Sequence, residues 1–280
     1  MPRKLADWKF KKQVLRLGER TLIVGILNVT PDSPADGGRY QEPELAYARA
    51  VEMIEQGADI VEVGAQSWRP GSERVSEAEE KRRLIPVLKK LRGKLGVPVA
   101  VETCTASVAE QALDLGAEII KDPAGLVIEP AIAKVVLEAN AGLVVQHMRG
   151  LPSEWAKMAQ IKDPSGAALA ELSAAAGRAM SAGVPKERIV VDPGFGLGKR
   201  KEQNTELLSR LDRLVAIGFP VQVSPCGKLF GTQPQAEAGT GLAAAVAFAS
   251  VLRGAHIVRT HEVGAIRPAV LLADELMRGA

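Results

Sequence analysis

The chain has 280 residues, of which 46% are hydrophobic and 25% charged, and its formal net charge is +3. These values are ordinary for a folded globular protein and exclude a disordered chain. So small a charge argues against nucleic acid as a partner, and no apolar run reaches the roughly 18 residues of a membrane span. Cys104 and Cys226 lie far apart in no metal-ligand spacing, so we expect free thiols and a cytoplasmic location.

Short β-rich runs alternate with helical segments along the chain. Residues 1–20 precede this pattern, and we expect them to form a hairpin or plug across the floor of a barrel. Eight runs typical of strands follow, over residues 21–28, 59–64, 98–103, 118–122, 142–147, 188–192, 220–224 and 256–261. Segments rich in Ala, Leu, Glu and Lys lie between them, and several end in Gly, as helices commonly do.

This alternation predicts the fold class. Strands that alternate with helices pair in parallel through right-handed crossovers, and eight such units close into a (β/α)8 TIM barrel. An open doubly wound sheet would normally carry a Gly-rich phosphate loop after its first strand, and no such motif opens this chain. We therefore predict an α/β protein with a single domain, in which residues 1–20 are an N-terminal extension and residues 21–280 form the barrel.

Polar side chains gather at the carboxyl ends of the predicted strands, where barrel enzymes keep their active sites. These positions are Asn28, 66–69, Glu102, Lys121, Asp122, Gln146, His147, Asp192, Lys228, Arg259 and His261. Arg259 and His261 alternate along the last strand, so their side chains point to one face. Together with Asn28 and Arg69 they form a predicted site for a phosphate or pyrophosphate group. The structural alternative makes Arg259 an ordinary salt-bridge partner.

The run VDPGFGLGKRKEQN (191–204) is a second candidate binding element. Asp192 ends a strand, and the glycines that follow let the backbone approach a ligand closely. A carboxylate there suits the paired donors of a guanidine-like or amidine-like edge of a heterocycle. The structural alternative is a glycine-rich turn capped by an aspartate.

Several motifs occur in one order along the chain: GILNVTPDS then DGGRY, GADIVEVG then RPGSERVS, VET, DPGFGLGK then QN, CGK, and RTHEV. In these motifs the chain resembles the dihydropteroate synthases of the wider pterin-binding barrel family. The resemblance implies a transferase of folate biosynthesis. Such enzymes condense 6-hydroxymethyl-7,8-dihydropterin diphosphate with 4-aminobenzoate, giving 7,8-dihydropteroate and pyrophosphate with the help of Mg2+. It also implies a homodimer.

The resemblance assigns four side chains to the pyrophosphate group: Asn28, Arg69, Arg259 and His261. It further assigns Asn28 to Mg2+, and Asp192 and Lys228 to the pterin ring. The catalytic set it implies is Asn28, Asp192, Lys228, Arg259 and His261. Residues 30–36 and 67–72 match two mobile loops that close over the aminobenzoate.

Several positions in the implied site depart from the family pattern, among them Gly227, which replaces an Arg in the CGK motif. Pro34 replaces a Phe that packs against the aminobenzoate ring, and Trp68 replaces a Thr in the second loop. We hypothesise that Trp68 takes over the lost ring contact. In the pterin pocket Glu102 replaces an Asp and Lys121 replaces an Asn. These two side chains are expected to project into one pocket and to pair with each other. The pair either competes with the pterin for hydrogen bonds or preserves the polarity of the pocket around a slightly shifted pterin.

Three interpretations remain open from the sequence. The first is a working synthase with reduced sensitivity to sulfonamides, which mimic aminobenzoate, because Pro34 and Trp68 remake that pocket. The second is a paralogue that binds a pterin or another heterocyclic diphosphate without forming dihydropteroate. The third is a pterin-binding methyltransferase domain. Arg69, Arg259 and His261 favour the synthase, because a methyltransferase has no pyrophosphate to hold.

Overall fold

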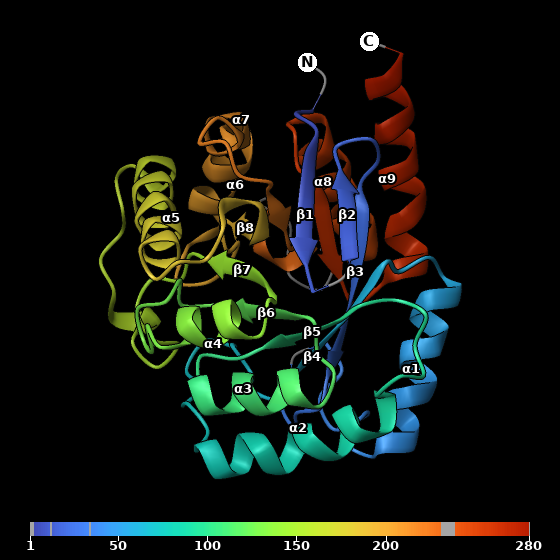
Figure 1. Cartoon of the computed structure of the whole chain (residues 1–280). Coiled ribbons are helices and arrows are strands. Elements are labelled where there is room, and N and C mark those ends of the chain that lie inside the picture. The colour runs from blue at the N-terminus through green and yellow to red at the C-terminus, as the bar shows by residue number, and fades with distance from the viewer. Residues whose placement is uncertain (1–2, 12, 34, 231–238, 280) are drawn as a thin grey trace.

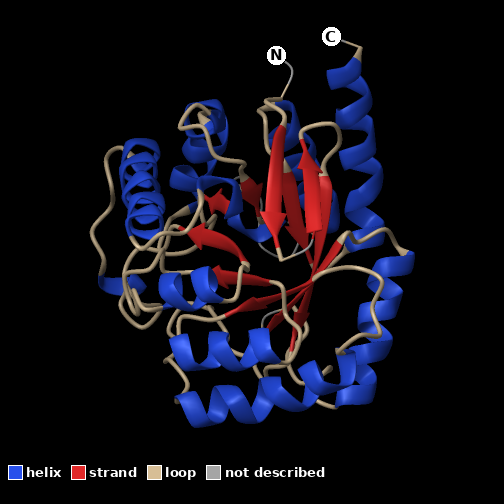
Figure 2. Cartoon of the chain, viewed as in Figure 1, coloured by secondary structure: helices blue, strands red, loops and turns tan. Residues whose placement is uncertain are grey.

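The computed structural model describes residues 3–279 apart from 12, 34 and 231–238. Eight strands lie at the centre of the molecule and helices surround them (Figure 1 and Figure 2). The central strands are β3 (Leu22–Asn28), β4 (Ile60–Gly64), β5 (Val99–Glu102), β6 (Ile119–Asp122), β7 (Gly142–Gln146), β8 (Ile189–Asp192), β9 (Gln222–Val223) and β10 (Ile257–Thr260). Each falls within one of the eight runs expected from the sequence.

The central sheet closes into a barrel. Its strand order is β8-β7-β6-β5-β4-β3-β10-β9, and the pairs between neighbouring strands are parallel. A parallel bridge between Val191 and Val221 joins its two ends, and the Val191 amide donates to the Pro220 carbonyl at 3.0 Å. The prediction of a (β/α)8 barrel is confirmed.

Helices cover the outside of the barrel, because each carries an apolar face and the strands present Val, Ile and Leu outward. Ser76 shows how a helix begins here: its side chain accepts a hydrogen bond from the Glu79 amide at the N-terminus of α2. The helices are α1 (Pro43–Glu55), α2 (Glu77–Leu91), α3 (Ala106–Asp114), α4 (Ile132–Glu138), α5 (Pro164–Ser181), α6 (Lys201–Ser209), α7 (Leu211–Val215), α8 (Thr240–Leu252) and α9 (Val263–Arg278). No helix in the described part of the chain is long and apolar enough to cross a membrane.

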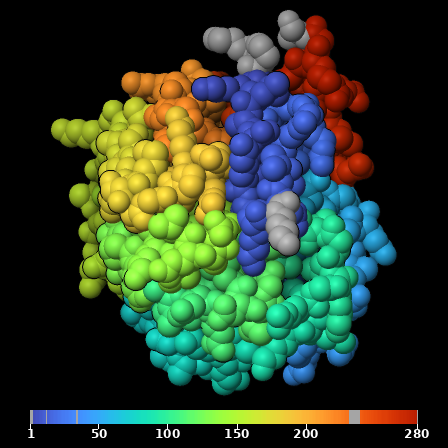
Figure 3. Space-filling view, in the orientation of Figure 1, coloured from blue at the N-terminus to red at the C-terminus, as the bar shows by residue number. Residues whose placement is uncertain are grey.

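An N-terminal hairpin covers the barrel floor. Its antiparallel strands are β1 (Ala6–Phe10) and β2 (Gln13–Leu17), which lie across the face that Figure 3 turns to the viewer. Trp8 and Phe10 are fully buried and meet edge to face, with 5.2 Å between ring centroids. Gly142 at the start of β7 permits this packing, because a Cβ there would lie 3.1 Å from Phe10 and 3.2 Å from Trp8.

The inside of the barrel changes from apolar to polar within one layer of side chains. Seven inward residues form the apolar layer above the hairpin: Val24, Ile60, Ala100, Ile119, Val144, Val190 and Ile257. Two residues further along each strand, the same face carries Ile26, Glu62, Glu102, Lys121, Gln146, Asp192 and Arg259. Six of these seven are polar or charged, so a charged layer lies directly on an apolar one at the carboxyl ends of the strands.

Candidate functional site

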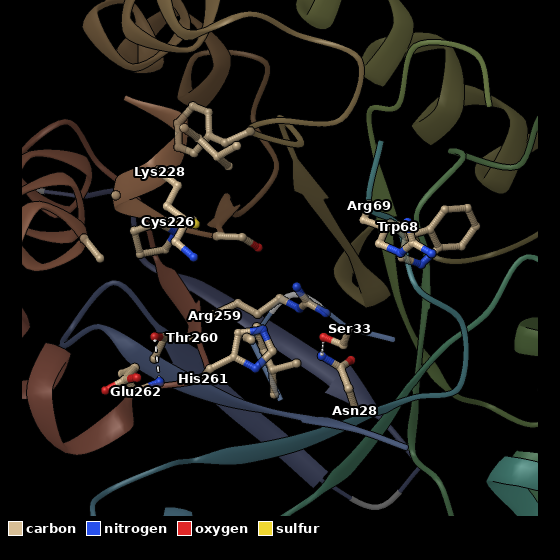
Figure 4. A pocket seen from close by; sticks show the side chains of 18 of the residues that line it. Asn28, Ser33, Trp68, Arg69, Cys226, Lys228, Arg259, Thr260, His261 and Glu262 are labelled. Atoms are coloured by element: carbon tan, nitrogen blue, oxygen red, sulfur yellow. Dashed lines mark hydrogen bonds between the residues drawn. The ribbon is translucent and has the colours of Figure 1, made fainter. Parts of the chain in front are cut away.

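A cavity of about 470 Å³ opens above the charged layer. Its walls come from the loops that follow β3, β4, β8 and β9, from the end of β10 and from the start of α8. Figure 4 shows Lys228 and Cys226 across the cavity from Trp68 and Arg69, with Arg259 between them. The carboxyl ends of the strands therefore form a hollow that is large enough for small-molecule substrates.

The structure brings most of the predicted site residues together around this cavity. The residues that line it include Asn28, Trp68, Arg69, Glu102, Lys228, Arg259 and His261. Lys121 and Asp192 belong to the charged layer beneath, where neither has any exposed surface. Pro34 lies outside the described residues.

The first loop is tied to the barrel through Asp36. Asn28 Nδ2 donates to Asp36 Oδ1 at 2.8 Å and to Ser33 Oγ at 2.9 Å. His261 Nδ1 lies 3.4 Å from Asp36 Oδ2. Burial opposes the charge of Asp36, but His261 and the hydrogen bonds from Asn28 and Ser33 outweigh it, so the pKa of Asp36 is lowered. Because the Asn28 amide group faces the loop, its Oδ1 is left without a bond to any described residue.

The second loop is joined to the first by one ion pair. Arg69 Nε lies 3.0 Å from Asp32 Oδ2, and both side chains are substantially exposed, at 46% and 39%. Such exposed pairs stabilise a protein by about 0–1 kcal/mol, so a phosphate group can displace Asp32 from Arg69 at little cost.

Four side chains of the charged layer form one ion cluster. Lys121 Nζ donates to Glu102 Oε2 at 2.7 Å, so the expected pairing of these two side chains is present. Arg259 Nη2 donates to the same oxygen at 3.0 Å. On its other side, Arg259 donates from Nε at 2.7 Å, and also from Nη2, to Glu62 Oε1. The cluster therefore holds two carboxylates and two cations.

The cluster favours the charged forms of Glu102 and Arg259. Burial opposes ionisation of Glu102, but Lys121 and Arg259 outweigh it, so the pKa of Glu102 is lowered. Burial likewise opposes the charge of Arg259, and Glu62 and Glu102 more than offset it, so the pKa of the guanidinium is raised. Glu102 therefore remains anionic and Arg259 remains a cation.

Asp192 is held in place by its neighbours. Its Oδ1 accepts from the Gly194 amide at 2.8 Å, and its Oδ2 accepts from Gln222 Nε2 at 3.1 Å. Gly194 has a φ of +63°, and a Cβ at this position would lie 2.0 Å from the His147 carbonyl oxygen, so only glycine fits. A ligand has to share Asp192 with these two partners or use the remaining lone pairs of the carboxylate.

Two members of this arrangement, Glu62 and Gln222, were not singled out from the sequence. Both lie inside strands whose interiors were expected to be apolar. The feature of the sequence that could have identified them is the alternation of inward and outward side chains along each strand. Glu62 lies two residues after the inward Ile60, and Gln222 lies between Val221 and Val223, which face the helices. A buried polar residue on the inward face of a barrel strand therefore marks the site as well as a strand end does.

The cavity wall also offers polar atoms that no described residue satisfies. Gln66 Nε2, Ser67 Oγ and Ser224 Oγ are buried in the wall and have no hydrogen-bond partner within the described chain. Buried polar groups in native proteins are nearly always paired. Three unpaired polar groups in one wall therefore indicate that a further polar partner, such as a ligand or water, belongs there. Among the described residues, no group of three or more His, Cys, Asp or Glu side chains is placed to hold a metal ion.

Fold and site together define a barrel enzyme with a polar cavity at its catalytic face. The family model described as pterin binding enzyme matches residues 24–261. The dihydropteroate synthase of Synechocystis sp. is 38% identical over 265 residues, covering 93% of this chain and 92% of that protein. The chain therefore belongs to the pterin-binding enzymes, among the dihydropteroate synthases.

Solved structures agree with this assignment. A Yersinia pestis dihydropteroate synthase in a sulfonamide complex superposes with a TM-score of 0.90, at 29% identity over 98% of this chain and all of that one. The Thermus thermophilus enzyme in complex with 4-aminobenzoate gives a TM-score of 0.83, at 38% identity over 96% of this chain and 99% of that one.

The ion cluster makes a stability prediction. Lys121→Met leaves Glu62 and Glu102 buried with a single cation, and breaking a buried pair in this way costs about 3–5 kcal/mol. We expect the free energy of unfolding, measured by urea titration, to fall by that amount. The double variant Glu102→Gln/Lys121→Met should lose less than the sum of the two single changes.

Lys134→Met is the matched control, because Lys134 pairs with Glu138 at 3.7 Å on an exposed helix face. This change should cost no more than about 0.5 kcal/mol. A loss for Lys121→Met as small as that of the control would show that the cluster does not stabilise the barrel.

Proposed function

We propose that this chain is an active dihydropteroate synthase, condensing 6-hydroxymethyl-7,8-dihydropterin diphosphate with 4-aminobenzoate to give 7,8-dihydropteroate and pyrophosphate. The observation that carries the proposal is the cavity itself. Its wall holds Asn28, Arg69, Arg259 and His261, and Lys228 lies across from Arg69 (Figure 4). A substrate with an anionic diphosphate end and a heterocyclic end matches this division.

The chemistry follows from where charge develops. The bond between the pterin methylene carbon and the diphosphate oxygen breaks, and its electron pair leaves with pyrophosphate. The amine of 4-aminobenzoate then donates its lone pair to the methylene carbon and afterwards loses one proton to solvent. Fixed cations and N–H donors at the diphosphate end stabilise the departing charge, which is the largest single contribution in many enzymes.

At the diphosphate end, Arg259 and His261 reach the cavity from β10 and Arg69 reaches it from the second loop. The weak Arg69–Asp32 pair leaves Arg69 available to a phosphate. We assign Mg2+ to Asn28 Oδ1, a neutral oxygen that no described residue occupies. Mg2+ accepts such an oxygen together with substrate phosphate oxygens and water, and when bound it neutralises part of the diphosphate charge.

At the heterocyclic end, we assign Lys228 and Asp192 to the pterin. Lys228 is exposed and lines the cavity, so its ammonium is free to approach acceptor atoms of the ring. Asp192 lies in the charged layer below, fixed by Gln222 and Gly194, and offers its remaining lone pairs to paired N–H donors. The Glu102–Lys121 pair forms the floor between these two ends of the substrate.

We further propose that the enzyme is a cytoplasmic homodimer. Cys104 and Cys226 are both free thiols, which suits a reducing compartment. Leu271, Leu272 and Leu276 are between 41% and 51% exposed on α9, and the neighbouring helix α8 exposes Leu252 at 40%. This apolar face suits contact with a second copy, so light scattering should give twice the chain mass of 29.7 kDa, and a monomer mass would exclude the dimer.

The synthase assignment is tested by incubating the purified chain with pterin diphosphate, labelled 4-aminobenzoate and Mg2+. Labelled dihydropteroate and pyrophosphate should form in equal amounts. Arg69→Met should raise KM for the pterin diphosphate at least about tenfold, because a charge-assisted contact to phosphate is lost. Pyrophosphate binding without condensation would instead identify the paralogue that binds a diphosphate but forms no dihydropteroate.

We expect Trp68 to contribute to the binding of 4-aminobenzoate. Its ring is the large aromatic surface that the second loop contributes to the cavity. Trp68→Thr should raise KM for 4-aminobenzoate about fivefold or more, since a buried aromatic contact is lost, and leave KM for the pterin diphosphate nearly unchanged.

Sulfamethoxazole should also inhibit the wild-type enzyme only weakly. The reason is that Pro34 and Trp68 change the pocket that sulfonamides share with 4-aminobenzoate. An unchanged KM for 4-aminobenzoate in Trp68→Thr would end the ring-contact hypothesis. Potent inhibition of the wild type by sulfamethoxazole would exclude the predicted resistance.

A further inference from the structure

Arg259 donates hydrogen bonds to two carboxylates of the charged layer, those of Glu62 and Glu102. Three of its five N–H donors are used: the one on Nε and one on Nη2 point to Glu62 Oε1, and the second on Nη2 points to Glu102 Oε2. The two donors on Nη1 bond to no described residue, and Arg259 lines the cavity. The guanidinium is therefore fixed along one edge, with its other edge left for a ligand.

The charges in the cluster balance. Glu62 and Glu102 together carry two negative charges, and Arg259 and Lys121 carry two positive ones. Lys121 Nζ lies 2.7 Å from Glu102 Oε2 and 3.9 Å from Glu62 Oε1, so it contacts both carboxylates. Without Lys121, two neighbouring buried carboxylates would share one guanidinium, and one negative charge would have no partner. Lys121 therefore supplies the counter-charge for the second carboxylate beneath Arg259.

A purely structural floor would not need these charges. The layer directly below, from Val24 to Ile257, fills the barrel with apolar side chains alone. Replacing a buried ion cluster by well-packed apolar residues is often neutral or stabilising in other proteins. The cluster lies directly beneath the cavity, and two of its members, Glu102 and Arg259, line it. This position indicates that the charges serve the reaction.

We infer that Glu62 is a positioning residue that holds Arg259 with its Nη1 edge toward the diphosphate. Lys121 supplies the positive charge that balances the second carboxylate bound to Arg259. The inference rests on the proposed synthase function. Glu62 does not reach the cavity surface and acts through Arg259. A guanidinium fixed before the reaction stabilises the departing pyrophosphate without having to reorganise.

This role predicts opposite effects on turnover and on product binding. In Glu62→Gln the guanidinium loses its carboxylate anchor, so kcat falls. The weaker bonds to the neutral amide at position 62 and the removal of one negative charge at the same time strengthen the hold on pyrophosphate. A defect in folding or packing would weaken both properties together.

The test uses a double-mutant cycle of four proteins: the wild type, Glu62→Gln, Arg259→Lys and the double variant. Lysine keeps the charge at position 259 but has no fork to be oriented. In each protein, kcat is measured with pterin diphosphate and 4-aminobenzoate, and the Kd of pyrophosphate with Mg2+ is measured by calorimetry. Glu80→Gln is the control, because Glu80 is equally buried but accepts its hydrogen bond from Thr105 Oγ1 at 3.0 Å, outside the cluster.

Glu62→Gln should lower kcat roughly tenfold or more and tighten pyrophosphate binding in the wild-type background. In the Arg259→Lys background both effects should shrink to less than about twofold, because the group through which Glu62 acts is gone. Glu80→Gln should change neither quantity.

Equal effects of Glu62→Gln in both backgrounds would overturn the inference, and so would weaker pyrophosphate binding in Glu62→Gln or no pyrophosphate binding by the wild type. If the wild type binds pyrophosphate with the expected coupling but makes no dihydropteroate, the positioning role stands and the synthase proposal fails.

Discussion

The two-residue alternation of the barrel strands is the constraint on which the site depends. Side chains at positions i and i+2 of a strand face the same way, so each inward apolar residue of the floor is followed by an inward residue at the rim. The hairpin fills the floor with Trp8 and Phe10, and the apolar layer above it excludes water from below. The charged layer then lies in a low-dielectric setting on one side and opens to the cavity on the other. Interactions within it are therefore stronger than on a surface.

That setting explains why the charges come as a balanced set. An unpaired ion buried at this depth would be costly, whereas Glu62, Glu102, Lys121 and Arg259 satisfy one another at hydrogen-bond distances. In the exposed loops, ion pairs are weaker and an unpaired charge costs less. The Arg69–Asp32 pair is screened by solvent and can be exchanged for a phosphate, while the buried cluster cannot rearrange without leaving a charge uncompensated. The fixed charges of the floor can therefore orient the diphosphate, while the loop residue Arg69 can exchange its carboxylate partner for a phosphate.

The sequence predicted the barrel well, because eight strand-like runs separated by helical segments admit few topologies. It also predicted most of the cavity wall, since polar residues at strand ends are visible without coordinates. The pairing of Glu102 with Lys121 was expected from the sequence, and the register of β5 against β6, which sets Glu102 beside Lys121, explains it.

Other features could not be read from local pattern. Glu62 and Gln222 lie within strands, and recognising them requires knowing which face of each strand points inward. The contacts of Asp32 with Arg69 and of Asp36 with His261 depend on the paths of two loops, for which the sequence has no periodic signal. Gln222 holds Asp192 across a sequence separation of 30 residues, a distance that only barrel closure spans.

A crystal structure of the enzyme with pterin diphosphate bound would test the role of the charged layer most directly. The expected result is that Arg259 keeps its bonds to Glu62 and Glu102 while Nη1 lies about 3 Å from a phosphate oxygen. The Glu102–Lys121 pair should also stay intact beneath the ligand. A structure in which Arg259 leaves Glu62 to reach the diphosphate, or in which the diphosphate binds away from Nη1, would contradict it.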